Sequence, residues 1–581
     1  MQTYGTRSGL FSLPAICAAA ATAVVLAIAP AVQAESTSEH DWYLEAIQTP
    51  RIEATNKRSD PIIIAVVDDG MRITHQDLTG FVWSNPKEKP NNRIDDDGNG
   101  YVDDVYGWDV SDQDNDVGAP AERPDFYHGT HIASIVTAIA KAAYGEAAAD
   151  HIQIMPVKSL SDSAPHTYIK SGYQGIRYAI DAGADIIICA WGVGHITAEE
   201  SAILKEAADK GILVVAASGN LPQELDQFPA AFAAVLAVGS IERDGSKTIN
   251  SNYGQFVDIS APGSAIRGAS STSDDAYDVK DGTSFSTAMV ATAAALVRLS
   301  NPRLTATEIE ACLLSSSRPI DITKREFSAK LGAGSLDIEA AVACDLLNEQ
   351  PDEVTQLVHS KGFMRAPTKS KDAFSWNIQP PGEFSGIRFT PMLNSDQAPK
   401  GLVEFRSTDR PDAEVIASYP LDAPPENIYV PGTTAYVTVA MKRNRRGPDW
   451  LLKYEAEPIN FSRLYCHDTK RLGTEGIIAD GSGPAPYSGN SDCKWQITAP
   501  EGKVVRIRFD SLATESQTDL IYFFNGAGTH EDIMALISGD ELPPAFTSWS
   551  NEVLIWFVSD DANHGQGWTL SYSFEDPQPK Q

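Results

Sequence analysis

The hydrophobic pattern of the first half of the chain alternates between two periods. Short, continuous apolar runs rich in Ile and Val are typical of strands buried on both faces of a parallel sheet. Longer segments with helical spacing lie between them and end at Gly or at Asn-Pro. The pattern predicts strands at 61–68, 152–158, 184–192, 212–220 and 233–242, and helices at 128–145, 168–183, 197–211 and 283–300. It therefore predicts an α/β domain at 35–348, with a parallel sheet and helices on both of its faces.

The pattern changes near residue 350, after which short apolar stretches alternate with turns rich in Pro, Gly and Asp. This half contains an internal repeat. The segment 374–389 resembles 493–509, and the tryptophans correspond as Trp376 with Trp495 and Trp450 with Trp568. A tryptophan that recurs at an equivalent place is first of all a core residue. The repeat predicts two tandem β-sandwiches, at 349–460 and 461–581, the second ending in a short disordered tail.

The first 34 residues read as a signal peptide. Arg7 supplies a sparse positive region, the apolar run at 18–29 follows, and Val32 and Ala34 are the small residues expected before a cleavage site. The alternative is a transmembrane anchor, but the run is short and ends at Pro30. We expect cleavage after Ala34, export to an extracellular or periplasmic location, and no membrane span in the mature chain.

The composition is strongly acidic, with 46 Lys and Arg against 78 Asp and Glu and a formal net charge of −32. Nucleic acids and anionic membranes are bound by basic surfaces, so the composition argues against both as partners. An acidic surface suits a soluble exported protein, which we expect to be a monomer.

An exported protein reaches an oxidising compartment, in which cysteines can form disulfides. None forms a CxxC pair, which argues against a zinc site. Cys189 lies in an apolar run and is expected to be a buried thiol. The expected disulfides are Cys466 with Cys493 and Cys312 with Cys344, although sequence alone leaves the connectivity open.

Four segments carry the residues for acyl transfer from a serine. Asp68 ends a predicted strand, Asn220 ends another, and His128 and Ser284 each open a predicted helix. A serine hydroxyl needs a base to take its proton, and the base needs an acceptor that fixes its tautomer. A side-chain amide and the N–H groups at a helix start can stabilise the developing oxyanion.

These segments, in this order, resemble the subtilisin-like serine proteases, or subtilases, over about residues 40–345. The resemblance implies a secreted serine endopeptidase that acts on proteins or peptides. It implies Asp68 as the orienting acid, His128 as the general base, Ser284 as the nucleophile and Asn220 as the oxyanion donor.

The resemblance also implies the substrate-binding residues, which are Ala190, Trp191, Gly192, Ala217, Ser218, Gly219 and Gln227. An extended substrate would pair with the main chain of the first segment, so the loss of the usual hydroxyl at Ala190 should be tolerated. Gln227 stands where the family usually has a small residue at the floor of a pocket. That pocket receives the side chain before the scissile bond, so Gln227 suggests a shortened or more polar pocket.

An acidic loop predicts a structural calcium site. Its oxygen-bearing residues alternate around glycines and are Asp95, Asp97, Asn99, Tyr101, Asp103 and Asp104. The terminal Glu of an EF-hand is missing, and Asp103 or Asp104 could replace it. A similar loop recurs in some subtilases, where it looks like a calcium site; the alternative is a solvated acidic turn.

The segment 464–575 resembles a CUB domain through Cys466, the stretch ending at Trp495 and the FVSDD and GWTLSY motifs. The resemblance implies a second calcium site at Glu515, Asp519 and Asp560. The earlier sandwich has basic residues where Asp560 would lie and is predicted to be a degenerate CUB-like copy. Both sandwiches are expected to dock the enzyme on a surface protein or glycan. Two other functions stay open: an inert surface-binding protein, and a transpeptidase or esterase on the same fold.

Overall fold

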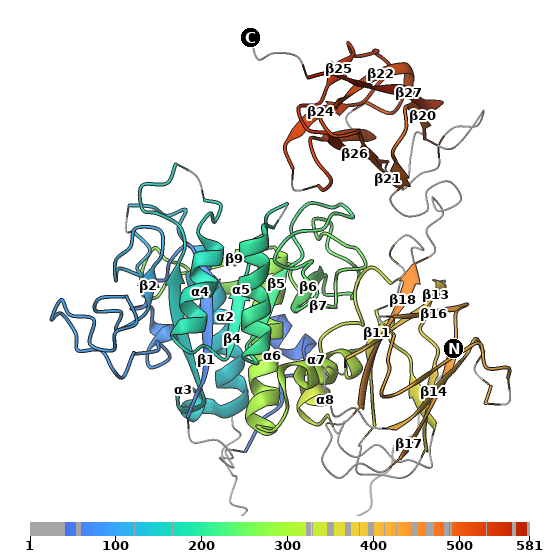
Figure 1. Ribbon diagram of the computed structural model, residues 1–581. Coiled ribbons are helices and arrows are strands. Elements are labelled where there is room, and N and C mark those ends of the chain that lie inside the picture. Colours follow the sequence, from blue (N-terminus) through green and yellow to red (C-terminus); the bar gives the residue numbers. More distant parts are fainter. Residues whose placement is uncertain are drawn as a thin grey trace, which may run out of the picture. The chain divides into compact units, whose positions relative to one another are not determined.

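The computed structural model describes residues 41–577 with internal gaps (Figure 1). The gaps are 54–59, 121, 166, 195, 321–326, 328, 345–353, 367–372, 383, 393–399, 409, 412, 426, 443–449, 459–469, 481–486, 488–490, 517, 530 and 560–564. The predicted signal peptide and the tail after 577 lie outside this description. Among the described residues, no helix is both long and apolar enough to cross a membrane.

The first half is built on a seven-stranded parallel sheet with the order β2-β3-β1-β4-β5-β6-β7. Its strands are β1 Ile62–Asp68, β2 Trp108–Asp109, β3 Ile152–Lys158, β4 Ile186–Cys189, β5 Leu213–Ala217, β6 Val235–Ile241 and β7 Ile259–Pro262. A hairpin of β8 Ile266–Ala269 and β9 Tyr277–Lys280 lies apart from this sheet. The parallel sheet expected from the apolar runs is confirmed.

Helices cover both faces of the sheet (Figure 1). They are α1 Trp42–Ala46, α2 His128–Tyr144, α3 Ala148–His151, α4 Gly172–Asp181, α5 Ala198–Asp209, α6 Thr283–Ser300, α7 Ala306–Ser315 and α8 Ile338–Val342, with 3-10 turns η1 Gln76–Leu78 and η2 Gly145–Ala147. Ile64 and Val66 of β1 share a core with α2 and α6. Ala65 and Val67 share the opposite core with α4 and α5. Because successive strand residues point to opposite faces, a strand between two cores must be apolar throughout.

One expected helix is shorter than predicted. The pattern predicted 168–183, but α4 begins at Gly172, and Tyr168 is exposed. A Cβ on Gly172 would lie 2.2 Å from the ring of Trp191, so the helix approaches that ring closely at its first residue. The preceding residues, 168–171, are bends or irregular and do not continue the helix.

The second half contains two sandwiches of the same topology. In the first, the sheets are β10-β12-β17-β14-β15 and β11-β18-β13-β16; in the second, they are β19-β21-β26-β23-β24 and β20-β27-β22-β25. Each strand of the first sandwich therefore corresponds to the strand nine numbers later. The first set comprises β10 Val354–Leu357, β11 Lys361–Ala366, β12 Ala373–Ile378, β13 Phe384–Pro391, β14 Lys400–Arg406, β15 Ala417–Pro420, β16 Ile428–Pro431, β17 Ala435–Lys442 and β18 Trp450–Pro458.

The second set comprises β19 Lys470–Leu472, β20 Gly476–Ala479, β21 Asp492–Thr498, β22 Val504–Ala513, β23 Leu520–Phe524, β24 Ile533–Ile537, β25 Phe546–Thr547, β26 Glu552–Val558 and β27 Gly567–Glu575. The four repeated tryptophans are core residues. Trp376 packs 5.7 Å from Trp450, and Trp495 packs 5.3 Å from Trp568, between ring centroids. The tandem sandwiches predicted from the repeat are confirmed.

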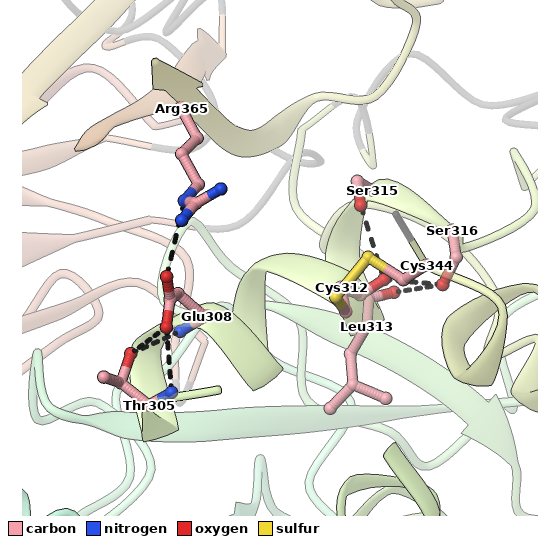
Figure 2. The surroundings of a disulfide bond; sticks show 8 residues. All are labelled: Thr305, Glu308, Cys312, Leu313, Ser315, Ser316, Cys344 and Arg365. Carbon is pink, nitrogen blue, oxygen red and sulfur yellow. Dashed lines mark hydrogen bonds and ion pairs between the residues drawn. A yellow bond between two sulfur atoms is a disulfide. The ribbon is translucent and has the colours of Figure 1, made fainter. Parts of the chain in front are cut away.

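A disulfide joins Cys312 in α7 to Cys344 just after α8 (Figure 2). At the other end of α7, Thr305 and Glu308 form a reciprocal cap in which each side chain accepts the other's main-chain N–H. Glu308 also pairs with Arg365 of β11, with 3.4 Å between Nε and Oε1 (Figure 2). The helix that carries the disulfide therefore also contacts the first sandwich.

Candidate active site

The predicted catalytic side chains gather at the carboxyl ends of adjacent strands. Asp68 is the last residue of β1, Ala190 follows β4, and Asn220 lies three residues after β5. In parallel sheets this edge is where ligands bind, because the strands stop and loops open there. His128 is the first residue of α2 and Ser284 is the second residue of α6, so the starts of these two helices bring both side chains to the same edge.

His128 and Asp68 are joined by a close contact. Nδ1 of His128 lies 2.8 Å from Oδ1 and 3.0 Å from Oδ2 of Asp68, which is buried. Burial disfavours the imidazolium, but the charge of Asp68 and its hydrogen bond, with a further contribution from Asp69, raise the pKa of His128 to about 9. The contact also leaves Nε2 as the ring nitrogen that faces away from the carboxylate.

Ser284 is buried at the start of α6, and its Oγ donates to the carbonyl oxygen of Ala190 at 3.1 Å. In the described part of the chain, its hydrogen bond is therefore made to the segment after β4 rather than to His128. Catalytic hydrogen bonds often form fully only when substrate is bound, so this arrangement is compatible with a nucleophile in a resting rotamer.

The side-chain amide of Asn220 is oriented by Thr283, a residue that the sequence did not single out. Oδ1 of Asn220 accepts from both the main-chain N and the Oγ1 of Thr283, each at 2.9 Å. With its oxygen occupied, the amide presents Nδ2 as its free donor; within the described residues this nitrogen makes no hydrogen bond. Thr283 directly precedes Ser284, so the donor is held next to the hydroxyl.

The predicted substrate-binding segments form two walls around Gln227. A Cβ on Gly192 would lie 3.0 Å from Oε1 of Gln227, and one on Gly219 would lie 3.1 Å from its Cγ. The Gln227 side chain therefore lies between the two glycines. Main-chain hydrogen bonds of 2.8 Å in both directions between Val193 and Phe228 hold this arrangement.

The other members of the two walls have structural partners. Nε1 of Trp191 donates to the carbonyl of Val67 at 3.0 Å, which holds the indole against β1. Ala217 and Ser218 are buried, and the Ser218 hydroxyl donates to the carbonyl of Asn252 at 3.3 Å. The side chains of these residues therefore pack into the protein and fix the position of the main chain.

The acidic loop brings three carboxylates together. Glu88, Asp95 and Asp97 each have an oxygen within 4.8 Å of the others. Glu88 is buried, and its Oε1 accepts from the main-chain N of Asp96 and Asp97, while Oε2 has no hydrogen-bond partner among the described residues. Sequence reasoning missed Glu88 because it precedes the alternating motif.

The remaining residues of the motif have other contacts. Oδ2 of Asp104 accepts from Asn99 at 3.0 Å and from the Tyr178 hydroxyl at 2.8 Å. Asp103 accepts from the main-chain N–H groups of residues 92 and 93, and the ring of Tyr101 packs edge-on against Tyr178. The two carboxylates considered as replacements for a terminal Glu therefore brace the loop.

In the second sandwich, Glu515 and Asp519 lie on the turn between β22 and β23. The hydroxyl of Tyr487 donates to Oδ2 of Asp519 and accepts from the main-chain N of Glu515. Asp560, the third predicted ligand, lies outside the described residues. So does Cys466, and its pairing with the disulfide-bonded Cys493 stays a prediction.

Comparison with known proteins identifies the families that the chain resembles. The subtilase family matches residues 59–335, and the CUB domain matches residues 466–572. Thermitase from Thermoactinomyces vulgaris is 33% identical over 40% of this chain and 74% of its own length. Halolysin from Haloferax mediterranei is 29% identical over 50% of this chain and 51% of its own length. Subtilisin Savinase from Lederbergia lenta is 27% identical over 52% of this chain and 97% of its own length.

The chain therefore belongs to the subtilase family of serine proteases, and it carries a CUB-like domain after the protease domain. It spans about half the length of halolysin. Among solved structures, the prenylagaramide maturation protease PagA matches 49% of this chain and 94% of its own, with 24% identity and a TM-score of 0.37. The protease domain of PatA matches 50% of this chain and 97% of its own, with 25% identity and a TM-score of 0.39.

Proposed function

We propose that this chain is a secreted endopeptidase that hydrolyses peptide bonds through Asp68, His128 and Ser284. The observation that carries the proposal is the double contact of the Asp68 carboxylate with Nδ1 of His128, at 2.8 and 3.0 Å. An acceptor at Nδ1 fixes the neutral tautomer whose Nε2 can take a proton, and it stabilises the imidazolium that follows.

In the proposed reaction, Ser284 rotates about χ1 so that its hydroxyl moves from the Ala190 carbonyl to Nε2 of His128. Oγ then forms a bond to the scissile carbonyl carbon, its proton passes to Nε2, and the carbonyl oxygen becomes the oxyanion. Collapse breaks the C–N bond, and His128 returns the proton to the leaving amine. Water repeats the two steps on the acyl-enzyme and restores the serine.

Asn220 is proposed as the side-chain donor to the oxyanion. Thr283 occupies its Oδ1, which supports Nδ2 as the group that faces the reacting carbonyl. A donor fixed before the reaction needs no reorganisation when charge develops, which is the main source of its contribution.

Gln227 is proposed to shorten the pocket for the side chain before the scissile bond. Its side chain lies between Gly192 and Gly219, the two positions where the walls lack a Cβ. A pocket already occupied in this way favours small side chains, or short polar ones that can hydrogen-bond to the amide.

Labelling by a fluorophosphonate, followed by digestion of a peptide library, tests the proposed function. Wild-type chain should be labelled at Ser284 and should cleave peptides, and Ser284→Ala should do neither while unfolding at the same temperature. No labelling of the folded wild type would indicate an inert binding protein. If the chain is labelled and hydrolyses esters but not peptides, it is an esterase. If it is labelled and transfers the acyl group to an added amine, it is a transpeptidase.

We also propose that the acidic loop binds a structural calcium ion through Glu88, Asp95 and Asp97. Two observations support the fit: the three carboxylates converge, and Oε2 of buried Glu88 has no hydrogen-bond partner within the described residues. Calcium takes six to eight oxygen ligands, so main-chain carbonyls or water would complete the shell. When bound, the ion removes the mutual repulsion of the carboxylates and joins the loop to the segment before it.

The remaining proposals concern the whole chain. We propose removal of the first 34 residues on export, a protease domain at 35–348, and sandwich domains at 349–460 and 461–581. The CUB-like domain would dock the enzyme on a surface protein or glycan, and a second calcium ion would bind at Glu515, Asp519 and Asp560. Binding of the wild-type chain to glycan and protein arrays, with and without calcium, tests these last two proposals together.

A further inference from the structure

We propose that Asp69 is a positioning residue of the active site, which holds the main chain of His128 while Asp68 holds its ring. This inference rests on the proposed role of His128 as the general base. Asp69 directly follows the orienting acid Asp68 in the sequence.

The two oxygens of Asp69 accept from two successive main-chain N–H groups. Oδ2 lies 3.0 Å from the N of His128, and Oδ1 lies 2.8 Å from the N of Gly129. These are first-turn donors of α2, which have no partner within the helix. The residue before the helix, Tyr127, supplies no side-chain cap. A carboxylate 59 positions earlier in the chain therefore does the work of the missing local cap.

The local backbone is shaped for this contact. A Cβ on Gly129 would lie 2.4 Å from the carbonyl oxygen of Gly70 and 3.3 Å from Oδ1 of Asp69. The start of α2 can approach the end of β1 this closely only because residue 129 lacks a side chain. Asp69 is 3% exposed, so the cap is shielded from water.

Asp68 and Asp69, at the end of β1, both hold His128. Asp68 fixes the direction of the imidazole, and Asp69 fixes the Cα from which the imidazole extends. Oδ1 of Asp68 also accepts from the main-chain N of Asp69 at 2.8 Å, so a shift of either carboxylate displaces the other. A base held at both ring and backbone keeps the short distance to a nucleophile that proton transfer requires.

Asp69 also contributes charge. Burial, followed by the neighbouring charge of Asp68, raises the pKa of Asp69 to about 7, while His128 and the two N–H groups oppose the rise. The other titratable groups around the pair are His131 in α2, Tyr127 before it, and Asp278 and Lys280 in β9. Asp69 differs from these groups because its carboxylate accepts a hydrogen bond from the main-chain N of His128.

The test is the pH profile of kcat/KM in Asp69→Asn and Asp69→Ala. Loss of the negative charge should move the acid midpoint lower in both variants, since the charge of Asp69 contributes to the raised pKa of His128. Asp69→Ala, which also loses the cap, should lower the plateau roughly tenfold. Asp337→Ala is the matched control, because Asp337 caps α8 through the N of Ala340 at 2.9 Å; loss of this cap should lower the unfolding temperature without moving the midpoint.

A merely structural Asp69 would lower the plateau and the unfolding temperature and leave the midpoint of Asp69→Asn unchanged, which would overturn the inference. A second measurement needs no variant and no activity. With 15N-histidine labelling, the main-chain amide of His128 should titrate together with Asp69, separately from the imidazole. An amide that follows only the ring would also overturn the inference. A wild-type chain that fails to react with a fluorophosphonate would defeat the proposed function without deciding this titration.

Discussion

Nζ of Lys361, the first residue of β11, lies 3.2 Å from Oδ1 of Asp258, which precedes β7 of the protease domain. Both side chains are buried, and Lys361 also pairs with Glu455 at 3.5 Å. The other oxygen of Asp258 accepts from the main-chain N of Ala237 at 3.0 Å. The first sandwich thus places a cation on a carboxylate that is already fixed within the parallel sheet.

Lys361→Met should therefore destabilise the chain strongly. Asp258 would keep only the more distant Lys453, at 4.0 Å. Complete loss of the partner of a buried charge costs about 3–5 kcal/mol, which sets the upper limit of the effect. We expect the unfolding temperature of the protease domain, followed by calorimetry, to fall by several degrees. Lys205→Met is the matched control, because Lys205 and Asp209 form an exposed pair; its effect should be negligible. Equal effects of the two substitutions would mean that the Lys361 contact contributes nothing to the stability of the protease domain.

Asn220→Ala should lower kcat by roughly 10²–10³ and leave KM nearly unchanged, because the oxyanion exists only after attack. Thr283→Val removes one of the two donors that hold Oδ1 of Asn220 and keeps the main-chain one. Its loss in kcat should be smaller, about tenfold, and should disappear in the Asn220→Ala background. Steady-state kinetics of the double-mutant cycle check this. Additive losses would show that Thr283 acts independently of the amide.

Gln227→Gly should open the pocket for the side chain before the scissile bond. We expect kcat/KM for substrates with Phe at that position to rise by roughly 10–100-fold, in the range that a few buried methylene groups contribute. Substrates with Ala there should change little. Gln223→Gly, on the same loop but with an exposed side chain, is the control. A wild-type chain that already cleaves after Phe and Ala equally well would exclude the shortened pocket.

The sequence predicts the strands that carry the site better than the residues that hold the site's side chains in place. The strands were predictable because Ile64 and Val66 face one core while Ala65 and Val67 face the other, which forces a continuous apolar run. The repeated tryptophans likewise report a shared topology. Thr283, Glu88 and Asp69 were not predictable as supports, because their contacts depend on tertiary geometry. Glu88 lies outside its motif, and the bond between Asp69 and the N of His128 spans 59 positions.

The pH dependence of kcat/KM should follow His128. The base acts in its neutral form, so activity should rise with pH through the raised pKa of about 9 and level off above it. In Asp68→Asn, loss of the carboxylate charge lowers the pKa of His128, so the midpoint should move down. The plateau should also fall by roughly 10⁴-fold, since the ring loses its tautomer and orientation. A profile of Asp68→Asn with an unchanged midpoint would show that another group titrates.

Calcium should raise the unfolding temperature of the full chain, and Glu88 should account for part of the rise. A ligand that binds only the folded state stabilises by about 2.7 kcal/mol at a hundredfold excess over its Kd. Glu88→Gln keeps the size of the side chain but removes charge from the oxygen that has no hydrogen-bond partner among the described residues. We expect the difference between calcium and EDTA to shrink by several degrees in this variant, measured by calorimetry of the protease-domain transition. Asp96→Asn makes the same charge change in the same loop, but Asp96 pairs with Lys89 at 2.9 Å, and it should keep the wild-type response. If Glu88→Gln and Asp96→Asn respond to calcium alike, the ion does not bind at Glu88, and the converging carboxylates form only a solvated acidic turn.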